Sequence, residues 1–417
     1  NGKTILEYTI KRLKKTKLSK NIIVATTKRE EDQKIIKVAK LVKKYYDQKN
    51  KVIVVSSAMS GATDDLIKKS KKISNTFEKS EQDVLVSTGE QITCSLLAGA
   101  LIELGLKSRS WLSWQLPILT EGSHTSSRIK KINIKEVLSF IKKGGIPVIT
   151  GFQGVSIDRR VTTIGRGGSD ASAIAIAKFF GADSCVIYTD VDGVYTTDPK
   201  VNSKAKRIDK ISYEEMLEMA SLGTKVMQSS SIQDAMLNNI KIDIRSTFSK
   251  NLGTKITDEI NVISKKAITG ISYTKDIAKI TVVGVKDKPG VASEMFKPLK
   301  EINLDMIVQS SSADKGETDI TFTIKREDIK KAINLLKKNK KISYEQIIQN
   351  DKVSKVSVVG AGMITQPGVA QKFFNALAKK KINIMVISTS EIKISVLIDQ
   401  QHTNKAVKVL HKEFDLE

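Results

Sequence analysis

The chain has 417 residues, a length that suggests two or three domains, and its hydrophobic share of 40% and charged share of 28% are ordinary for a globular protein. Its net charge of +25 comes mostly from lysine, and aromatic residues make up only 5%, so a nucleic-acid partner is not expected. Because no apolar run approaches the roughly 18 residues of a membrane span, and the first residues lack a signal-peptide pattern, we expect a cytoplasmic protein without a membrane partner. Cys94 and Cys185 are expected to be buried thiols, and the three histidines lack metal-ligand spacing, so no metal site built from protein side chains is expected.

Residues from about 50 to 250 alternate between short β-branched runs and helical patterns. "NKVIVVSSA", "GIPVITGFQG" and "DSCVIYTDVDG" indicate strands, whereas "ITCSLLAGALIELG" and "DASAIAIAKFFGA" indicate helices. This alternation predicts a largely parallel sheet covered on both faces. The loops "SSAMSG", "GFQG" and "TDVDGVYTTDP" each follow a strand, so we expect them to meet at the edge of the sheet where such folds bind ligands.

A glycine-rich loop precedes the second of these helices. Gly165, Gly167 and Gly168 flank Arg166, and Ser169 and Asp170 follow them. The loop is neither a Walker A motif nor a strict dinucleotide fingerprint. Because it opens a helix, its amides and the helix dipole are suited to a negatively charged group.

Simpler structural roles are open for two acidic residues. Asp170 has the residue type and position of a helix N-cap, and Glu90 in "STGEQITCSLL" stands where a capping residue would begin an apolar helix.

An internal repeat begins after about residue 260. "AKITVVGVKDKPGVASEMFKPLKEINLDMIVQSSS" is echoed about 75 residues later by "SKVSVVGAGMITQPGVAQKFFNALAKKKINIMVISTS". Both copies read as a strand, a Pro-Gly turn, an amphipathic helix and a second strand, which predicts two βαββαβ modules. Each turn opens a helix, where free N–H groups suit small anionic ligands.

Several of these stretches together resemble one family. "VVSSAMSG", "STGEQ", "GFQG", "TTIGRGGSDASA", "YTDVDGVYTTDP", "KISYEEMLEMASLGTKVMQ" and "ISTSEIKISVLID" are similar to the motifs of aspartate kinases. The resemblance implies an α/β amino-acid-kinase fold, a mostly parallel sheet between helices, followed by two ferredoxin-like ACT domains. The expected parts are an atypical segment (1–34), the catalytic domain (35–257), and two ACT domains (258–337 and 338–417).

The same resemblance implies a reaction and the residues that serve it. Aspartate kinases transfer a phosphoryl group from Mg·ATP to the β-carboxylate of L-aspartate, giving 4-phospho-L-aspartate at the start of lysine, threonine and methionine biosynthesis. ATP and Mg²⁺ are therefore the expected cofactors. The matching positions are Asp170 and Lys225 for catalysis; Ser57, Thr63, Glu90, Arg166 and Ser169 for the substrate; and Thr189, Asp190, Tyr195, Asp198, Lys200 and Lys225 for the nucleotide.

The ACT repeats imply feedback control by an end-product amino acid. The expected effector is lysine, threonine or both, and Asp287, Gln309 and Asn383 fall where effector contacts occur in the family. A simpler interpretation of Asn383 is that it ends a helix. A homodimer or larger assembly through the ACT domains is also implied.

The N-terminal segment departs from the family. The family's first strand ends in Lys-Phe-Gly-Gly-Thr-Ser, whereas residues 1–34 resemble a fragment of a sugar-nucleotide cytidylyltransferase. Counting back from "KVAK" places Ile23 at the catalytic lysine and Ala25 and Thr26 at the glycines, with Lys28 as a possible substitute cation.

"NIIVATT" is apolar enough to fill the first strand, so we expect the fold to survive and turnover to be slow. The alternative is a catalytically impaired, amino-acid-sensing regulatory subunit.

Overall fold

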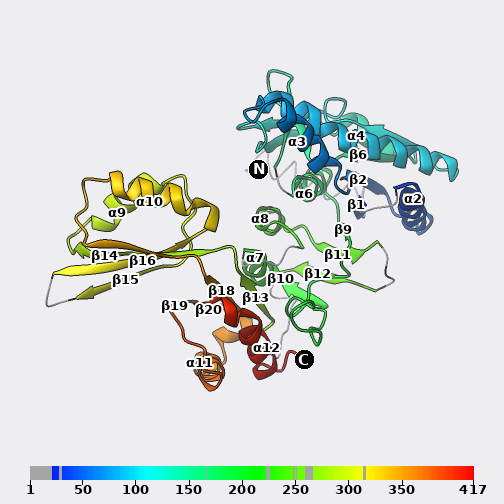
Figure 1. The fold of residues 1–417 in the computed structure, drawn as a ribbon. Helices are drawn as coiled ribbons and strands as arrows, with labels where there is room; N and C mark the ends of the chain where they lie inside the picture. Colours follow the sequence, from blue (N-terminus) through cyan, green and yellow to red (C-terminus); the bar gives the residue numbers. More distant parts are fainter. Residues whose placement is uncertain are drawn as a thin grey trace, which may run out of the picture. The chain divides into compact units, whose positions relative to one another are not determined.

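The computed structural model describes residues 21–27, 31–165, 167–221, 226–247, 249, 251–258, 266–312 and 316–417. These residues form two compact units. The first unit holds the described residues up to 194, together with 207–220 and those within 226–258. The second holds 195–206, 221 and the described residues from 266 onward. Each unit is treated by itself below (Figure 1).

The first unit is built on an eight-stranded sheet in the order β10-β12-β11-β9-β1-β2-β6-β3. From β11 to β3 every neighbouring pair is parallel, and β12 runs antiparallel to β11. The mostly parallel sheet predicted from the sequence is therefore confirmed. Its strands are β1 (Asn21–Thr27), β2 (Val52–Met59), β3 (Ser108–Trp111), β6 (Ile146–Thr150), β9 (Cys185–Thr189), β10 (Lys210–Ser212), β11 (Ile242–Ser246) and β12 (Thr254–Thr257).

The segment expected to fill the first strand lies in the middle of this sheet. β1 pairs in parallel with β2 on one side and β9 on the other, and Ile23 is in register with Val54 and Val186. The expectation that "NIIVATT" forms a strand is confirmed. Residues 1–20 and 28–30, which carry the rest of the predicted atypical segment and Lys28, lie outside the described residues.

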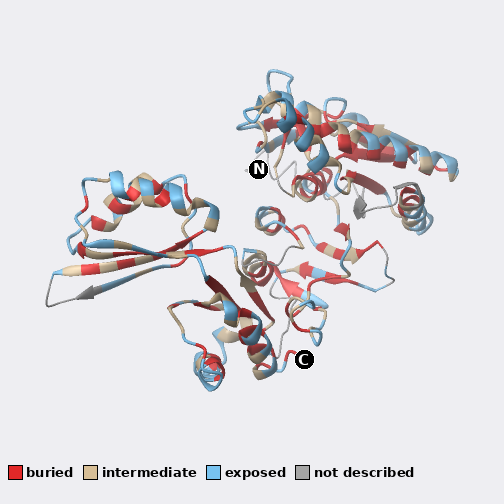
Figure 2. Cartoon of the chain, in the orientation of Figure 1, coloured by how far each residue is buried: buried red, intermediate tan, exposed pale blue. Residues whose placement is uncertain are grey.

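Helices cover the sheet, and β2, β6 and β9 are buried along nearly their whole length (Figure 2). Val54 and Val148 pack in one core cluster with side chains of α2 and α4, while the alternate residues Ile53 and Val55 are equally buried. α6 packs against β1, β2 and β9. The helices of this unit are α2 (Glu31–Asp47), α3 (Ala62–Ile73), α4 (Lys79–Glu103), α5 (Lys135–Lys142), α6 (Gly168–Phe180), α7 (Tyr213–Ser221) and α8 (Ser229–Leu237).

A second, smaller sheet in this unit has the order β5-β4-β7-β8. Its strands are β4 (Ile118–Glu121), β5 (Arg128–Ile132), β7 (Gln153–Val155) and β8 (Val161–Thr163).

α4 is longer than the apolar run in the sequence suggested. Among the described residues it is the one helix whose length and composition would let it cross a membrane, and half of its most apolar window is buried inside the protein. Cys94, on the buried side of α4, donates its thiol to the Val148 carbonyl at 3.1 Å, and Cys185 is also a free, buried thiol. The expectation of two buried thiols is confirmed, and α4 has the character of a core helix.

The second unit contains two four-stranded sheets with the same plan. In the first, β14 (Ala278–Lys286), α9 (Val291–Phe296), β15 (Ile307–Ser312), β16 (Glu317–Ile324), α10 (Ile329–Lys338) and β17 (Gln346–Asn350) give the order β15-β16-β14-β17. In the second, β18 (Val353–Val359), α11 (Val369–Lys379), β19 (Val386–Ser390), β20 (Lys393–Asp399) and α12 (Thr403–Glu413) give the order β19-β20-β18, and β13 (Gly270–Thr274) completes it beside β18. Both predicted ferredoxin-like modules are confirmed.

The fourth strand of the second module comes from upstream of the first. β13 pairs antiparallel with β18, from Gly270 opposite Val359 to Thr274 opposite Lys355. The first module, 278–350, is thus inserted between two strands of the second. The domain boundaries at 257/258 and 337/338 stay predictions.

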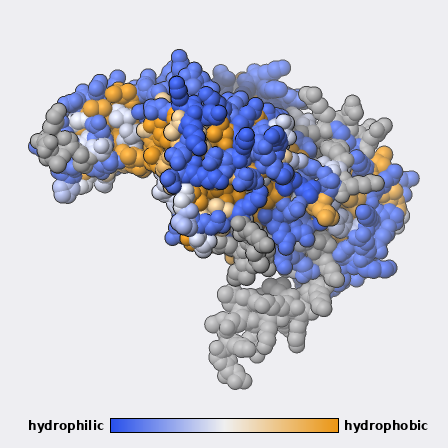
Figure 3. Space-filling view, turned by 90° about the horizontal axis from the view of Figure 1, so that it is seen from below, coloured by the Kyte–Doolittle hydropathy of each residue, from blue (hydrophilic) through white to orange (hydrophobic). Residues whose placement is uncertain are grey.

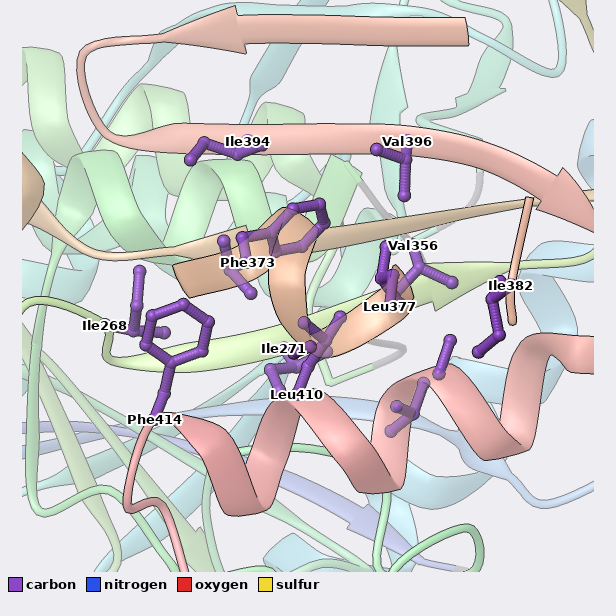
Figure 4. Packing of buried hydrophobic residues seen from close by; sticks show 14 of the residues in the cluster. Ile268, Ile271, Val356, Phe373, Leu377, Ile382, Ile394, Val396, Leu410 and Phe414 are labelled. Carbon is purple, nitrogen blue, oxygen red and sulfur yellow. The ribbon is translucent and has the colours of Figure 1, made fainter. Parts of the chain in front are cut away.

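The core of the second module lies between its sheet and its two helices. In Figure 4, Phe373 and Leu377 of α11 and Leu410 of α12 point toward Ile271 of β13 and Val356 of β18. β13 therefore supplies core side chains as well as backbone hydrogen bonds.

The two Pro-Gly turns of the repeat adopt the same conformation. Gly290 precedes α9 with φ +89°, and Gly368 precedes α11 with φ +86°. Both angles lie in the left-handed region, which glycine enters at least cost. The repeat seen in the sequence therefore extends to the start of each helix.

On the face shown in Figure 3, hydrophilic residues predominate and hydrophobic residues gather in patches between them. This agrees with the dispersed lysines of the sequence.

Candidate active site

A cavity of about 470 Å³ opens beside the carboxyl end of β2 and the start of α6. This volume is in the range of small-molecule sites. Its lining includes Ser57 of β2, residues at the start of α3, Phe152 after β6 and the glycine loop after β8. Of the three loops expected to meet, "SSAMSG" and "GFQG" contribute lining residues and "TDVDGVYTTDP" contributes none. Its lining residues are Ser57, Thr63, Asp64, Ile67, Gln82, Val86, Glu90, Thr125, Phe152, Thr163, Gly165, Gly167, Gly168, Ser169 and Asp170.

The glycine loop forms the entry to α6. Gly165 and Gly167 have φ of +83° and +70°, and Gly167 is the N-cap of α6. A Cβ on Gly168 would lie 2.6 Å from the Phe152 ring, so this position has no room for a larger residue. The loop therefore brings backbone close to the cavity at the positive end of a helix dipole.

Asp170 lies in the first turn of α6, three residues after the cap. The interpretation of Asp170 as the N-cap is therefore wrong, because glycine in the left-handed conformation takes that position. Burial raises the pKa of the Asp170 carboxyl to about 7. A carboxyl placed beside helix amides and with a raised pKa is typical of functional sites.

Glu90 contributes a second carboxyl to the cavity. It lies in the middle of α4 and not at its start, so the capping role is also wrong. The side chain is 2% exposed; Oε1 accepts a hydrogen bond from the Ala58 N–H at 3.1 Å, while Oε2 has no hydrogen-bond partner among the described residues. Burial raises its pKa to about 7. Oε2 is therefore a buried acceptor that a cationic ligand group would satisfy.

Two hydroxyl groups lie side by side in the same cavity. Ser169 in the first turn of α6 donates to Ser57 at the end of β2, with 3.0 Å between the two Oγ atoms. Gly151 makes this approach possible, because a Cβ there would lie 3.1 Å from the Ser169 Cα and 3.0 Å from the Ser56 carbonyl oxygen.

The cavity thus brings together five of the predicted residues: Ser57, Thr63, Glu90, Ser169 and Asp170. Arg166 and Lys225 lie outside the described residues. Sequence reasoning missed Thr125, Phe152 and Thr163. The "GFQG" motif pointed to the neighbourhood of Phe152 and "TTIGRGGSDASA" includes Thr163, but nothing in the sequence marked Thr125.

The residues predicted for the nucleotide lie in different parts of the chain. Thr189 ends β9 and donates to the carboxylate of Asp190 at 3.0 Å. Tyr195, Asp198 and Lys200 belong to the second unit. There Asp198 accepts the N–H of Lys200 at 2.9 Å and the hydroxyl of Tyr273 at 3.2 Å. None of these residues lines the cavity that holds Glu90.

The three residues predicted for the effector are exposed. Asp287 follows β14 and Gln309 lies on β15 in the first module, whereas Asn383 follows α11 in the second. A second cavity of about 370 Å³ lies beside the start of α11. None of the three lines either cavity.

Comparisons with known proteins agree with this fold. The sequence model of the amino acid kinase family matches residues 17–246, and that of an ACT domain matches 280–339 and 356–414. An aspartate kinase of Stutzerimonas stutzeri is 45% identical over 389 residues, covering 92% of this chain and 94% of the relative. The aspartokinase of Pseudomonas aeruginosa is also 45% identical, over 390 residues, with the same coverage of both chains.

Two solved structures extend the likeness to three dimensions. The aspartate kinase of Synechocystis has a TM-score of 0.53 and 34% identity, covering 94% of this chain and 69% of its own. E. coli aspartokinase III in complex with aspartate and ADP has a TM-score of 0.78 and shares the fold at 20% identity, covering 95% of this chain and all of its own. The chain therefore belongs to the amino acid kinase family and, within it, to the aspartate kinases.

Proposed function

We propose that this chain catalyses phosphoryl transfer from Mg·ATP to the β-carboxylate of L-aspartate. A β-carboxylate oxygen attacks the γ-phosphorus, the bond from that phosphorus to the β,γ-bridging oxygen breaks, and ADP leaves. The observation that carries the proposal is that buried Glu90, whose Oε2 has no hydrogen-bond partner among the described residues, lines the same cavity as the amino end of α6. An acceptor for an ammonium group near donors for carboxylates suits a small zwitterion.

Each side chain of the cavity has a task in this proposal. Glu90 accepts the substrate ammonium, and Ser57 and Thr63 donate to its carboxylates. Ser169 positions the side-chain carboxylate, and Arg166 binds the α-carboxylate through its planar guanidinium. These contacts orient the attacking oxygen, which is the main contribution a protein makes to phosphoryl transfer.

The nucleotide is proposed to bind through Thr189, Asp190, Tyr195, Asp198 and Lys200, with Lys225 near its phosphates. Asp170 then organises the cations around the transferring group. Mg²⁺ bound with ATP would neutralise phosphate charge, with phosphate oxygens and water as its main ligands. Among the described residues, no three His, Cys, Asp or Glu side chains cluster as a metal site.

Regulation is proposed to act through the two ACT modules. E. coli aspartokinase III, which shares the fold, has been solved in complex with lysine and aspartate in its T-state. By analogy, lysine, threonine or both bind near Asp287, Gln309 and Asn383, and the chain assembles as a homodimer or larger oligomer in the cytoplasm.

The segment around β1 leads us to expect a slow turnover in phosphoryl transfer. We propose that residues 1–34 derive from a cytidylyltransferase-like sequence, which leaves Ile23 at the position of the family's catalytic lysine. Isoleucine donates no hydrogen bond to a phosphoryl oxygen. Isoleucine at position 23 favours one alternative function. In this alternative the chain is a catalytically impaired regulatory subunit that senses amino acids.

A coupled ADP-release assay with aspartate separates the two functions. We expect the parent chain to bind aspartate and turn over slowly, and the triple variant Ile23→Lys, Ala25→Gly, Thr26→Gly to gain at least tenfold in rate. Aspartate binding by calorimetry is measured alongside as the control. A parent with family-like rates would contradict the impairment, and a parent that binds no aspartate would contradict the enzyme itself.

A further inference from the structure

A fully buried carboxylate lies behind the wall of the cavity. Asp83 of α4 has no exposed surface and is not among the cavity's lining residues. It precedes Glu90 by seven residues, which places both on the same face of the helix about 10 Å apart along its axis. A buried charge of this kind is retained only with good partners.

Three segments supply those partners. The Thr163 hydroxyl at the end of β8 donates to Oδ1 at 2.5 Å, the Thr125 N–H lies 3.1 Å from each carboxylate oxygen, and His124 Nδ1 lies 2.7 Å from Oδ2. One side chain therefore ties α4, the loop 122–127 and β8 together. Of the residues it holds, Thr125 and Thr163 both line the cavity.

The loop 122–127, which Asp83 holds, also lies close to the glycine loop. Thr125 has φ +69°, a conformation that a non-glycine residue adopts only when its surroundings enforce it. A Cβ on Gly165 would lie 3.3 Å from the Thr125 carbonyl oxygen, so the two backbones are close. A shift of Thr125 therefore moves the surface against which the glycine loop, with Arg166 next in sequence, is packed.

We propose that Asp83 is a positioning residue for aspartate binding: through Thr125 and Thr163 it fixes the cavity wall that faces the substrate, without contacting the substrate. The inference rests on the proposed function, because aspartate is its ligand. Asp83 acts by holding a strained loop in place. Its loss should therefore reduce the free energy of aspartate binding more than it reduces the free energy of unfolding.

The chain offers a matched control on the same strand. Thr162 and Thr163 are adjacent, 3% and 2% exposed, and each donates or accepts one buried side-chain hydrogen bond. Thr162 pairs with Thr120 at 2.6 Å and does not line the cavity. Valine at either position removes one buried hydroxyl of the same kind, so the folding costs should be similar.

The test is aspartate affinity by calorimetry on the full chain, with the denaturant midpoint measured for each variant. Thr163→Val should weaken aspartate binding at least fivefold. Thr163→Ser, which keeps the hydroxyl, and Thr162→Val should each bind aspartate within twofold of the parent affinity. Asp83→Ala should weaken it at least tenfold. Asp83→Asn, which keeps Oδ1 as an acceptor, should weaken it less than Asp83→Ala does.

Failure of the inference is distinguishable from failure of the proposed function. A parent chain that binds no aspartate overturns the function. A parent that binds aspartate, with Thr163→Val and Thr162→Val indistinguishable in affinity, overturns the role of Asp83 alone. The same conclusion follows if serine at 163 does not restore binding. If Asp83→Ala does not fold, the threonine and asparagine variants decide the outcome.

Discussion

Replacing Glu90 by glutamine should stabilise the protein at pH 8 and weaken its binding of aspartate. Burial raises the pKa of Glu90 from its ordinary value of 4.5 to about 7, so the folded state keeps a proton that the unfolded state loses. The contribution of Glu90 to the stability of the parent therefore falls as pH rises from about 4.5 to about 7 and is constant above that range. A shift of this size corresponds to roughly 3 kcal/mol at 1.36 kcal/mol per pKa unit.

Glutamine preserves the shape and the acceptor for the Ala58 N–H but never ionises. Glu90→Gln should therefore be more stable than the parent at pH 8 by up to roughly 3 kcal/mol and equal to it near pH 4. Its aspartate affinity should fall by at least tenfold, because a charged acceptor for the ammonium is lost.

The assay is urea denaturation followed by tryptophan fluorescence. The chain has two tryptophans, Trp111 and Trp114, and both lie in the first unit, so the signal reports on the unit that holds Glu90. Asp170 also has a raised pKa in the parent and is present in both proteins, so only the difference between them is attributed to Glu90. A variant no more stable than the parent at pH 8, or a pH dependence that the substitution leaves unchanged, refutes the reasoning.

Two further predictions concern packing and pH. Gly151→Ala should cost on the order of 1–3 kcal/mol in unfolding free energy and weaken aspartate binding, because the new Cβ meets Ser169 and the Ser56 carbonyl; unchanged calorimetric affinity would contradict the close packing. His411 is buried with a lowered pKa and Nε2 lies 2.8 Å from the Thr196 hydroxyl oxygen. Since the unfolded state gains the proton first, the second unit should lose stability as pH falls below about 6.5, a loss that His411→Gln should reduce in circular-dichroism denaturation curves.

The sequence pattern predicted the structural features that depend only on residues close together in the sequence. Alternating strands and helices placed three loops at one edge of the sheet, and the glycines around Arg166 predicted a close approach of backbone to the cavity. The Pro-Gly turns predicted the starts of α9 and α11. Each of these features follows from backbone preferences that a few consecutive residues determine.

What the sequence did not reveal depends on contacts across the chain. The sequence pattern indicated a helix start at Glu90, but Gly89 before it is already helical. Gly89 also packs closely against β2, since a Cβ there would lie 2.8 Å from the Ala58 Cβ. Thr125 and Phe152 take positive φ without being glycine. Asp83 is bonded to residues 41 and 80 positions away. Such pairings have no local signature, so only the folded chain exposes them.

The order in which the strands of the second ACT module occur affects how a regulatory fragment should be cut. A fragment that starts at β14 would include every helix of both modules yet leave β18 without its neighbour on one side. An open strand edge can pair with strands of other chains. The apolar core of the second module would also lack the side chain of Ile271. A piece that begins a few residues before Gly270 keeps the pairing of β13 with β18, so we expect it to aggregate less than a piece that begins at β14.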